Sequence, residues 1–533
     1  MNLLKATGTI GGLTLVSRIL GMVRDMLMAR YVGAGFASDA FLIAWRLPNL
    51  FRALFAEGAF SAAFVPMFNR VMAQNIDPDD PLAGQKCAVA FAGQILSVLV
   101  PFLTIFTLIM MLAAGPVVYA MTGGFPEAGA GDGAEKFALA RHLTLITFPY
   151  LGLISLTSLL GGILNSLGRF WVNAAAPVLL NICMIVAIVF FRGDGEVATA
   201  MTQAVAVTIS GLMQLLWLIW SCRRAGVVLR LQRPRLTPDV RKLLAVIGPA
   251  AIGQGAIQFN LLISTSLAAR FLPQGAVSYI YYADRLNQLP LGLIGIGVGT
   301  AILPALSRQI GGGDPRAASH TQNRAMELAL FLALPAAIAL FVSAVPIIRG
   351  VLQHGAFTAF DTMGSAAVLA AFAPGVPAYV FIKVLTPGFY ARQDTRTPVR
   401  IAFIAMLVNL VGNLALIWPL GAVGIALSTA ISAWVNVVLL YGVLHRHGHL
   451  QMDARFRAKA VRIVLAGVAM GAALWGLNIL LDPYMVAGFW ERIVALGLLC
   501  GGGALVYGLA SFLFGAYRLS ELKGQFRRPA RKS

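Results

Sequence analysis

Residues 88–114 read AVAFAGQILSVLVPFLTIFTLIMMLAA, a run without one charged side chain. A helix needs about 20 mostly apolar residues to cross a bilayer, so this run predicts a membrane span. The whole chain shares this character, since 59% of its 533 residues are hydrophobic, 12% are charged and the mean hydropathy is +0.80. Soluble domains contain about 45–50% apolar and about 25% charged residues. The composition therefore excludes an ordinary soluble enzyme and predicts a polytopic membrane protein.

Windows of spanning length recur along the chain and number fourteen, which predicts an all-α fold with 14 transmembrane helices. Helices 2 and 8 are the longest, and at ~1.5 Å per residue they should project beyond the bilayer core. The windows are 10–32, 37–69, 88–114, 138–164, 171–191, 197–221, 243–270, 276–308, 325–347, 364–388, 398–418, 421–444, 460–481 and 490–514.

Positive charge gathers on one side of this fourteen-span arrangement. Seven cationic residues lie in segment 222–242 with only Asp239 against them, and further clusters follow helix 12 and helix 14. On the opposite side Lys136 lies among acidic residues. Because cytoplasmic loops are rich in Lys and Arg, both termini are expected in the cytoplasm. Topology and contact with anionic membrane lipid then explain the net charge of +20, and nucleic acid is not an expected partner.

Three groups of residues in the first half recur weakly in the second. Ala44-Trp45-Arg46-Leu47 matches Ala283-Asp284-Arg285-Leu286, Asn181 matches Asn409, and Ile209-Ser210 matches Ile431-Ser432. Each copy would hold six helices, and an even number keeps both copies in one orientation across the membrane. The pattern predicts two six-helix lobes related by an axis along the membrane normal, plus two extra C-terminal helices. Chance similarity among apolar stretches is the alternative.

The repeat sets the predicted division of the chain. Residues 1–221 form an N-lobe, residues 222–242 a basic cytoplasmic linker and residues 243–445 a C-lobe. Residues 446–533 hold helices 13 and 14 and a basic cytoplasmic tail. Two such lobes would enclose a cavity near the bilayer midplane, where secondary transporters bind their substrates.

Ionisable residues inside the predicted spans point to the function. Four arginines facing lipid would cost about 10–14 kcal/mol, at roughly 2.5–3.5 kcal/mol each. That sum is comparable with the whole stability of a typical protein, so these groups must face water or pair with one another. The ionisable residues in question are Arg18, Arg24 and Asp25 in helix 1, Asp39, Arg46, Arg52 and Glu57 in helix 2, and Asp284 and Arg285 in helix 8.

The spacing of these charges favours a shared cavity. Arg18 and Asp25 are seven residues apart, as are Asp39 and Arg46, so each pair lies on one helix face. Helices 1, 2 and 8 are therefore predicted to line a cavity that holds more cations than anions. Arginine suits a phosphate ligand, because its planar fork donates two parallel hydrogen bonds and stays charged when desolvated.

Other interpretations of these charges remain open. The residues could form internal salt bridges, for example Arg18 with Asp25 and Arg285 with Asp39, and Arg46 could snorkel towards the membrane surface. No G-K-[ST] or H-E-x-x-H sequence occurs, so neither a nucleotide site nor a zinc site is expected. Asp77-Pro78-Asp79-Asp80 could hold Mg²⁺ in a phosphotransferase, but its prolines favour a solvated turn.

Several motifs together resemble the MurJ (MviN) family of bacterial lipid II flippases, within the MOP exporter superfamily. The resemblance covers nearly the whole chain, and the helix 2 motif is highly specific. The matching residues are Ser17-Arg18-Ile19-Leu20-Gly21 to Arg24-Asp25, Asp39-Ala40-Phe41, Pro48-Asn49-Leu50 to Arg52, Phe55-Ala56-Glu57-Gly58-Ala59-Phe60-Ser61, Tyr281-Tyr282-Ala283-Asp284-Arg285-Leu286 and Pro387-Gly388-Phe389-Tyr390-Ala391-Arg392-Gln393-Asp394.

The resemblance implies a fourteen-helix protein of the bacterial inner membrane that moves the undecaprenyl-diphosphate-linked peptidoglycan precursor outward and is not an enzyme. It also implies that helices 13 and 14 form a groove for the lipid tail. Two departures concern the charges: Gln288 stands where the family often has a glutamate, and helices 7 and 11 contain no Asp or Glu. Sodium coupling through carboxylates of those helices, as in some relatives, is therefore not expected here.

The resulting hypothesis is alternating access between two lobes, with lipid II and membrane lipids as partners. The substrate-binding set is Arg18, Arg24, Arg52, Arg285, Asp25, Asp39 and Asp284. No catalytic residue, metal or cofactor is expected; the membrane potential is the expected driving force, and the coupling ion is left open. We expect a monomer, with proteins of cell-wall synthesis and division as candidate partners. The rivals are another MOP exporter, a Mg²⁺-dependent polyprenyl-phosphate enzyme and a non-transporting scaffold.

Overall fold

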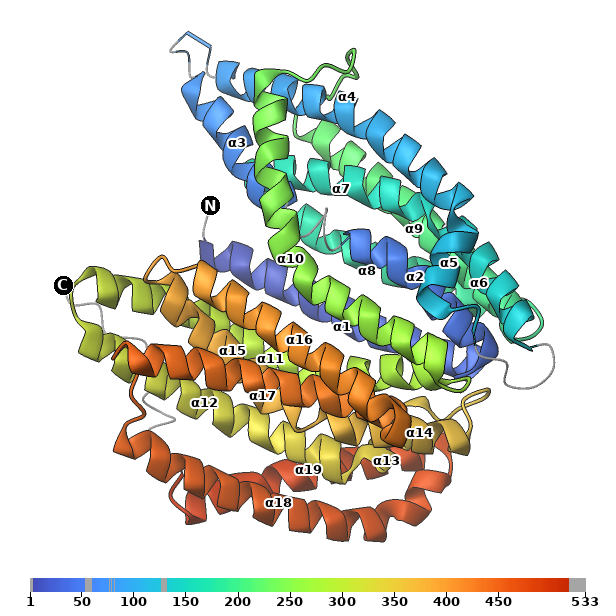
Figure 1. Ribbon diagram of the computed structural model, residues 1–533, viewed down its shortest axis with the longest axis vertical. Helices are drawn as coiled ribbons and strands as arrows, with labels where there is room; N and C mark the ends of the chain where they lie inside the picture. The colour runs from blue at the N-terminus through green and yellow to red at the C-terminus, as the bar shows by residue number, and fades with distance from the viewer. Residues whose placement is uncertain are drawn as a thin grey trace. The chain divides into compact units, whose positions relative to one another are not determined.

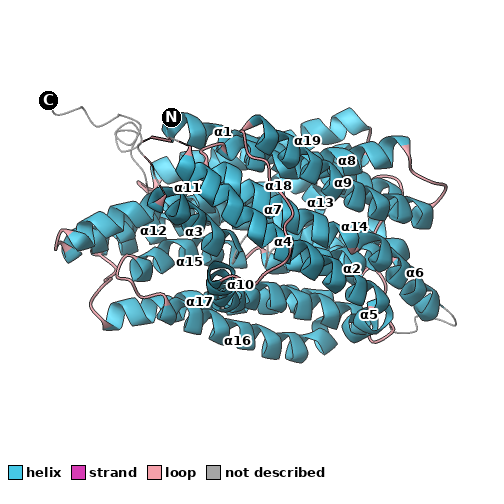
Figure 2. Ribbon diagram, turned by 90° about the horizontal axis from the view of Figure 1, so that it is seen from above, coloured by secondary structure: helices cyan, strands magenta, loops and turns pink. Residues whose placement is uncertain are grey.

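The computed structural model describes residues 3–52, 60–75, 77, 79–80, 82–125 and 132–516. These residues form nineteen helices and no strand (Figure 2). Ten of the described segments are helical, long and apolar enough to cross a membrane. The prediction of an all-α, polytopic protein is confirmed, whereas the count of fourteen spans stays a prediction.

The first compact unit comprises residues 1–278 and 354–357 (Figure 1). Its helices are α1 (Leu3–Val32), α2 (Phe36–Phe51), α3 (Phe60–Gln74), α4 (Ala83–Leu112), α5 (Ala114–Thr122), α6 (Asp132–Thr147), α7 (Pro149–Ser166), α8 (Phe170–Phe190), α9 (Glu196–Arg224) and α10 (Pro238–Phe271). Phenylalanines of α3, among them Phe64 and Phe68, are completely buried against α4 and α7 in its core.

The second compact unit comprises residues 279–353 and 358–533. Most of α11 (Ala276–Gly311) belongs to it, together with α12 (Pro315–Val342), α13 (Ala344–Leu352), α14 (Ala359–Phe372), α15 (Gly375–Tyr390), α16 (Arg396–Leu420), α17 (Ala422–Arg446), α18 (Ala454–Val486) and α19 (Phe489–Leu513). Helices α18 and α19 pack on each other and on α12 around Met470, Leu474 and Tyr507.

The order of helices is nearly the same in the two halves of the chain. A long helix followed by one of nine residues occurs as α4–α5 and again as α12–α13. A divided span follows in each half, as α6–α7 and α14–α15. Pro149 begins α7, and because proline lacks a backbone N–H it is tolerated at the first turn of a helix and breaks a longer one. This order agrees with the predicted repeat.

One predicted span differs between the halves. The window 37–69 holds two helices, α2 and α3, whereas its counterpart α11 is one helix of 36 residues. Helix α2 continues past Pro48 to Phe51, and Glu57 lies outside the described residues.

The compact units divide the chain at Ser278, later than the predicted boundary of 242–243. Helix α10 belongs to the first unit because it contacts α2, α3 and α5. The predicted lobes follow the sequence repeat, whereas the units follow contacts, so the lobe boundaries stay a prediction.

Candidate functional site

The first cluster of charges lies on α1. Arg24 and Asp25 are buried, at 7% and 3% exposure, and form an ion pair of 2.7 Å from Arg24 Nη2 to Asp25 Oδ1. Arg24 Nε donates to the same oxygen at 3.0 Å, and Nη1 donates to Asn181 Oδ1 on α8 at 3.0 Å. A charged group inside a membrane helix needs such partners, and here they come from its own helix and from the neighbouring helix.

Asn181 links α8 to α1 at a second point. Its Nδ2 donates to the backbone oxygen of Ser17 at 2.9 Å and to Ser17 Oγ at 3.3 Å. A Cβ atom on Gly21 would lie 3.7 Å from the Asn181 amide, so the two helices pass closely here. The amide therefore fixes the segment of α1 between Ser17 and Arg24, and Arg18 lies half-buried within it.

The two arginines of the predicted span 37–69, Arg46 and Arg52, have different hydrogen-bond partners. Arg52, which follows α2, donates from Nε to Asn49 Oδ1 at 2.9 Å. Arg46 donates from Nη2 to the backbone oxygen of Leu261 on α10 at 3.2 Å. Arg46 therefore has a partner on a helix that is far away in the sequence. The interpretation that Arg46 snorkels towards the membrane surface did not include such a partner.

The carboxylate of Asp39 is the centre of a second cluster, 1% exposed near the start of α2. Its Oδ2 lies 2.8 Å from Lys136 Nζ and accepts the backbone N–H of Gly275 at 2.8 Å. Its Oδ1 accepts from the backbone N and the Oγ of Ser278, at 2.9 and 2.6 Å. The carboxylate thus caps the first turn of α11, where unpaired N–H groups and the helix dipole favour an anion.

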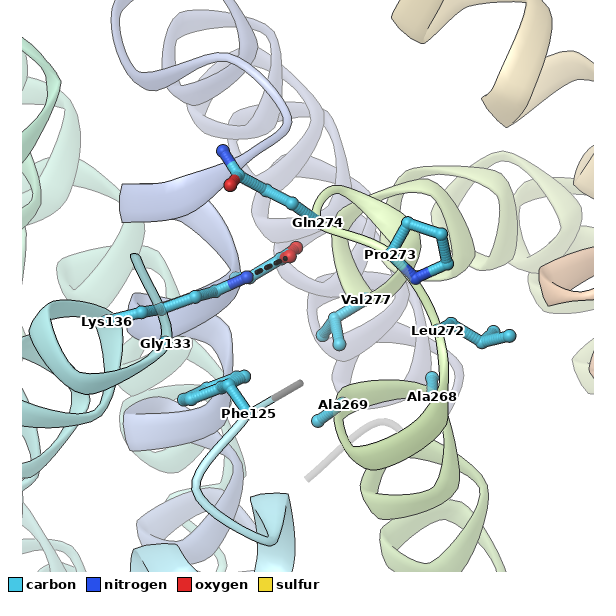
Figure 3. Close-up of a pocket in the computed structure, with 10 residues that line it drawn as sticks. Phe125, Gly133, Lys136, Ala268, Ala269, Leu272, Pro273, Gln274 and Val277 are labelled. Atoms are coloured by element: carbon cyan, nitrogen blue, oxygen red, sulfur yellow. Dashed lines mark hydrogen bonds and ion pairs between the residues drawn. The ribbon is translucent and has the colours of Figure 1, made fainter. Parts of the chain in front are cut away.

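The sequence places Lys136 among the charges of a loop before the predicted span 138–164, whereas the structure places it on α6. Its side chain on α6 is 6% exposed and points between Phe125 and Gln274 (Figure 3). Nζ lies 4.8 Å from the centre of the Phe125 ring, a cation–π distance. With Asp39, Ala268 and Val277 these residues line a small cavity. Sequence reasoning missed Lys136 because its partner is 97 residues away.

In the second unit, the charged residues of the predicted span 276–308 lie on α11. Asp284 Oδ2 accepts from Gln288 Nε2 at 2.5 Å, one helical turn later. Arg285 lies with its guanidinium carbon 5.0 Å from the centre of the Tyr281 ring. The amide at position 288 donates to Asp284, whereas an ionised glutamate there would repel it.

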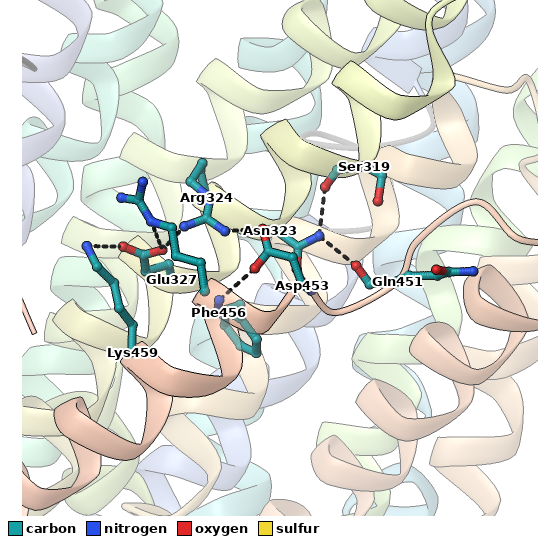
Figure 4. Close-up of polar contacts among 9 residues, drawn as sticks. Ser319, Asn323, Arg324, Glu327, Gln451, Asp453, Phe456 and Lys459 are labelled. Carbon is teal, nitrogen blue, oxygen red and sulfur yellow. Dashed lines mark hydrogen bonds and ion pairs between the residues drawn. The ribbon is translucent and has the colours of Figure 1, made fainter.

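A further cluster joins α12 to the start of α18 and was not predicted. Glu327, 2% exposed, lies 2.7 Å from Lys459 Nζ through Oε1, and its Oε2 contacts Arg324 and, at 3.6 Å, Arg455 (Figure 4). Arg324 also pairs with Asp453, which caps α18 by accepting the N–H of Phe456 at 2.6 Å.

The Asp453 carboxyl lies just before α18 and accepts hydrogen bonds from Phe456 and Arg324. Partial burial raises its pKa, but the hydrogen bonds from Phe456 and Arg324 lower the pKa by more than burial raises it. The pKa therefore lies below the ordinary aspartate value. In sequence these charges looked like one basic segment before helix 13. Only the packing of α12 against α18 reveals the buried acid among them.

Asp77 and Asp80 accept hydrogen bonds from nearby backbone N–H groups. Asp77 Oδ1 accepts from Asp79 N, Asp80 Oδ1 accepts from Leu82 N, and Asp80 Oδ2 lies 2.7 Å from Lys86 Nζ. Within the described ranges no group of three His, Cys, Asp or Glu residues could hold a metal ion. These bonds are those of a solvated turn.

The predicted binding residues are distributed over both units. Arg18, Arg24, Asp25, Asp39 and Arg52 belong to the first, and Asp284 and Arg285 belong to the second. Within the first unit, the structure brings Arg24 and Asp25 together and pairs Asp39 with Lys136. The chamber that would join these charges to Arg285, and their contact with a substrate, stay predictions.

Comparison with known proteins gives matches over nearly the full length. The family model described as "Lipid II flippase MurJ" matches residues 28–495. A probable lipid II flippase MurJ from Rhizobium tropici is 39% identical over 533 residues, covering 99% of this chain and 97% of that protein.

Two solved structures share the fold. A structure of lipid II flippase MurJ in an inward closed conformation has a TM-score of 0.75 and 22% identity, covering 95% of this chain and 98% of that one. An inward-facing MATE multidrug resistance transporter of the MOP superfamily has a TM-score of 0.64 and 15% identity, covering 81% and 95%.

Proposed function

We propose that this chain, which belongs to the lipid II flippase MurJ family, moves lipid II from the inner to the outer leaflet of the bacterial inner membrane. The family assignment drawn from its sequence motifs is confirmed. In this proposal the protein is a transporter and not a catalyst, works as a monomer, and has both termini in the cytoplasm. The charge of its loops supports that orientation.

One observation carries the proposal: α1 holds a buried arginine, Arg24, that is fixed by partners on its own helix and on α8. Arg24 is fixed by Asp25 and Asn181, and Arg18 lies on the same segment of α1. A buried charge is costly and is kept in membrane proteins where it serves a substrate or an ion. Arginine in such a setting suits the diphosphate of a lipid-linked precursor.

The ion pair of Arg24 with Asp25 gives this site a resting state. With no anion bound, Asp25 compensates the guanidinium and limits repulsion among the neighbouring cations. When the diphosphate arrives, Arg18, Arg24, Arg52 and Arg285 bind it, and the polyprenyl tail remains in lipid. A bound anion shifts the equilibrium towards the conformation that it binds better, and in this proposal that conformation opens to the outside.

Asp39 has a different role in this proposal. Its carboxylate holds the turn before α11 to α2 and α6, at the end of α1 that is farther from the N-terminus. We assign Asp39 and Lys136 to closure of the outer end, which must open before the substrate leaves. Asp284, held by Gln288, is assigned to orienting Arg285 on the next position of α11.

The membrane potential can drive this transport without a cofactor. Each negative charge moved outward against an inside-negative potential gains ~2.3 kcal/mol per 100 mV. The nearest rival is a drug exporter of the same superfamily. The excess of cations among the candidate residues disfavours it, because a cationic drug needs an acidic cavity.

The test replaces the cavity arginines in cells depleted of their own flippase. Arg18→Ala and Arg52→Ala should each abolish exposure of lipid II on the outer leaflet, measured with a membrane-impermeant hydrolase that cuts lipid II. Arg316→Ala, which removes an exposed arginine at the start of α12, is the matched control and should leave exposure unchanged. Normal lipid II exposure with Arg18→Ala or Arg52→Ala at normal protein levels would refute the proposal.

A further inference from the structure

The segment between α9 and α10, residues 225–237, is extended and fixed to the first unit; we call it the strap. Val227 is 1% exposed in the core of that unit, and Leu229 packs against the same core. The backbone N–H of Gln232 donates to Ser97 Oγ on α4 at 2.7 Å, and Thr237 Oγ1 donates to Gln94 Oε1 at 3.2 Å. The strap is therefore an ordered element and not a free loop.

A glycine lets the strap lie close to α4. A Cβ atom on Gly93 would be 3.2 Å from the backbone oxygen of Arg230, closer than most real Cβ contacts. The strap crosses α4 at Gly93–Ser97, close to the start of the apolar run 88–114. The crossing point therefore lies near the end of α4 at which the predicted span begins.

The exposed side chains of the strap include both cations and large apolar groups. Arg230, Arg233 and Arg235 are exposed. Between and beside them Val228, Leu231 and Leu236 are also exposed, at 57%, 67% and 54%. Water does not favour exposed leucine, whereas a bilayer surface takes apolar groups among its acyl chains and cations at its headgroups.

Tryptophans place the strap at the depth of the headgroups. Trp220 on α9 and Trp171 on α8 are about half exposed, and both rings contact Trp217, with centroid distances of 5.3 and 5.9 Å. Tryptophan is enriched where membrane meets water. The guanidinium carbon of Arg224, the last residue of α9, lies 4.3 Å from the centre of the Trp220 ring. The strap begins at the next residue, just beyond this aromatic layer.

We propose that the strap is a docking surface for the anionic headgroups of the glycerophospholipids around the protein. The flanks strengthen the attraction, because segment 222–242 carries seven cationic residues against one acid. A single lipid II diphosphate fits the strap poorly, since the five residue steps from Arg230 to Arg235 span roughly 16 Å when the chain is extended. The strap instead reaches several headgroups and fixes α4 and α10 at the membrane surface.

The experiment measures lipid binding, not transport. Full-length protein in neutral detergent is titrated with phosphatidylglycerol or phosphatidylcholine carrying brominated acyl chains, and quenching of tryptophan fluorescence reports occupancy. We expect phosphatidylglycerol to bind at least about tenfold more tightly than phosphatidylcholine, with the preference weakened by salt. The triple variant Arg230→Gln, Arg233→Gln, Arg235→Gln should lose most of this preference, and Trp220→Phe should lower the quenching amplitude.

A charge-matched triple variant serves as the control. Arg308→Gln, Arg316→Gln and Arg396→Gln remove three exposed arginines from the second unit and should keep the preference. Thermal unfolding verifies that both triples fold, and the salt titration of the unaltered protein tests the electrostatic attraction without any variant. An equal preference in the strap triple and the unaltered protein would overturn the proposal. Loss of the preference in both triples, or competition by lipid II alone, would also overturn it.

Discussion

Two buried carboxylates, Asp39 in the first unit and Glu327 in the second, are held in different ways. Asp39 has one cation, Lys136, and three neutral donors, which are the backbone N–H of Gly275 and the backbone N–H and hydroxyl of Ser278. Glu327 has three cations and lies between two continuous helices, α12 and α18 (Figure 4). Both are nearly inaccessible to water, at 1% and 2% exposure.

The difference separates a contact that can open from one that is permanent. The backbone donors to Asp39 lie in the turn before α11 and in the first turn of that helix, and Lys136 lies on α6, so the carboxylate can release the start of α11 without unfolding a helix. The donors to Glu327 include Arg324 of its own helix and Lys459 within α18, so breaking them separates α18 from α12. We infer that transport uses the first cluster for movement and the second to hold the added helices α18 and α19.

The largest effect is expected for Asp39→Ala. The substitution leaves the buried Lys136 ammonium without its carboxylate and leaves two backbone N–H groups without an acceptor. Together these losses should lower the free energy of unfolding by about 3–5 kcal/mol. Thermal unfolding in detergent measures this loss. Adding Lys136→Met removes the stranded charge and should recover part of the stability, whereas Lys136→Met alone should cost less than Asp39→Ala. A double variant no more stable than Asp39→Ala would refute the ion pair as the source of the effect.

A smaller effect is expected for Glu327→Gln, about 2–3 kcal/mol, because Arg324 keeps its bond to Asp453 while Lys459 loses its charged partner. The same unfolding assay applies. Limited proteolysis near residues 446–453 should also accelerate, since the start of α18 loosens. If cleavage there is unchanged while stability falls, Glu327 does not hold α18 in place.

The smallest effect is expected for Arg455→Gln. Its side chain is 50% exposed and lies 3.6 Å from Glu327, so solvent screens the pair and the loss should stay below about 1 kcal/mol. Denaturation at low and at high salt measures it, and the difference from the unaltered protein should shrink at high salt. A loss as large as that of Glu327→Gln would show that all three cations act as one network.

Sequence patterns predicted the helical class, the family and the residues that carry charge within the spans. They also predicted the repeat, which agrees with the recurring order of long, short and divided helices. The patterns did not single out Lys136 or Glu327, because Lys136 lies just before the predicted span 138–164 and Glu327 lies at the start of the predicted span 325–347. The partners of both side chains come from other helices, and periodicity gives the face of a helix without saying which helix covers it.

Asn181 and Asn409 illustrate the same limit. The sequence pairs them as equivalents, yet Asn181 binds Ser17 and Arg24 of α1, whereas Asn409 binds Thr429 and Asn413 in its own unit. The two amides, which the sequence repeat makes equivalent, thus have different partners. Asn181 binds a charged side chain of α1, whereas Asn409 binds uncharged side chains of α16 and α17.

By itself the sequence determined that this chain folds as helices in lipid, because a continuous apolar run of about 20 residues satisfies its backbone hydrogen bonds within one helix. Only the tertiary structure decided which acid meets which cation. Lys136 and Asp39 are 97 residues apart, and Arg324 and Asp453 are 129 apart. An ion pair forms between groups that packing places a few ångströms apart, and that proximity depends on helix contacts that no local pattern encodes.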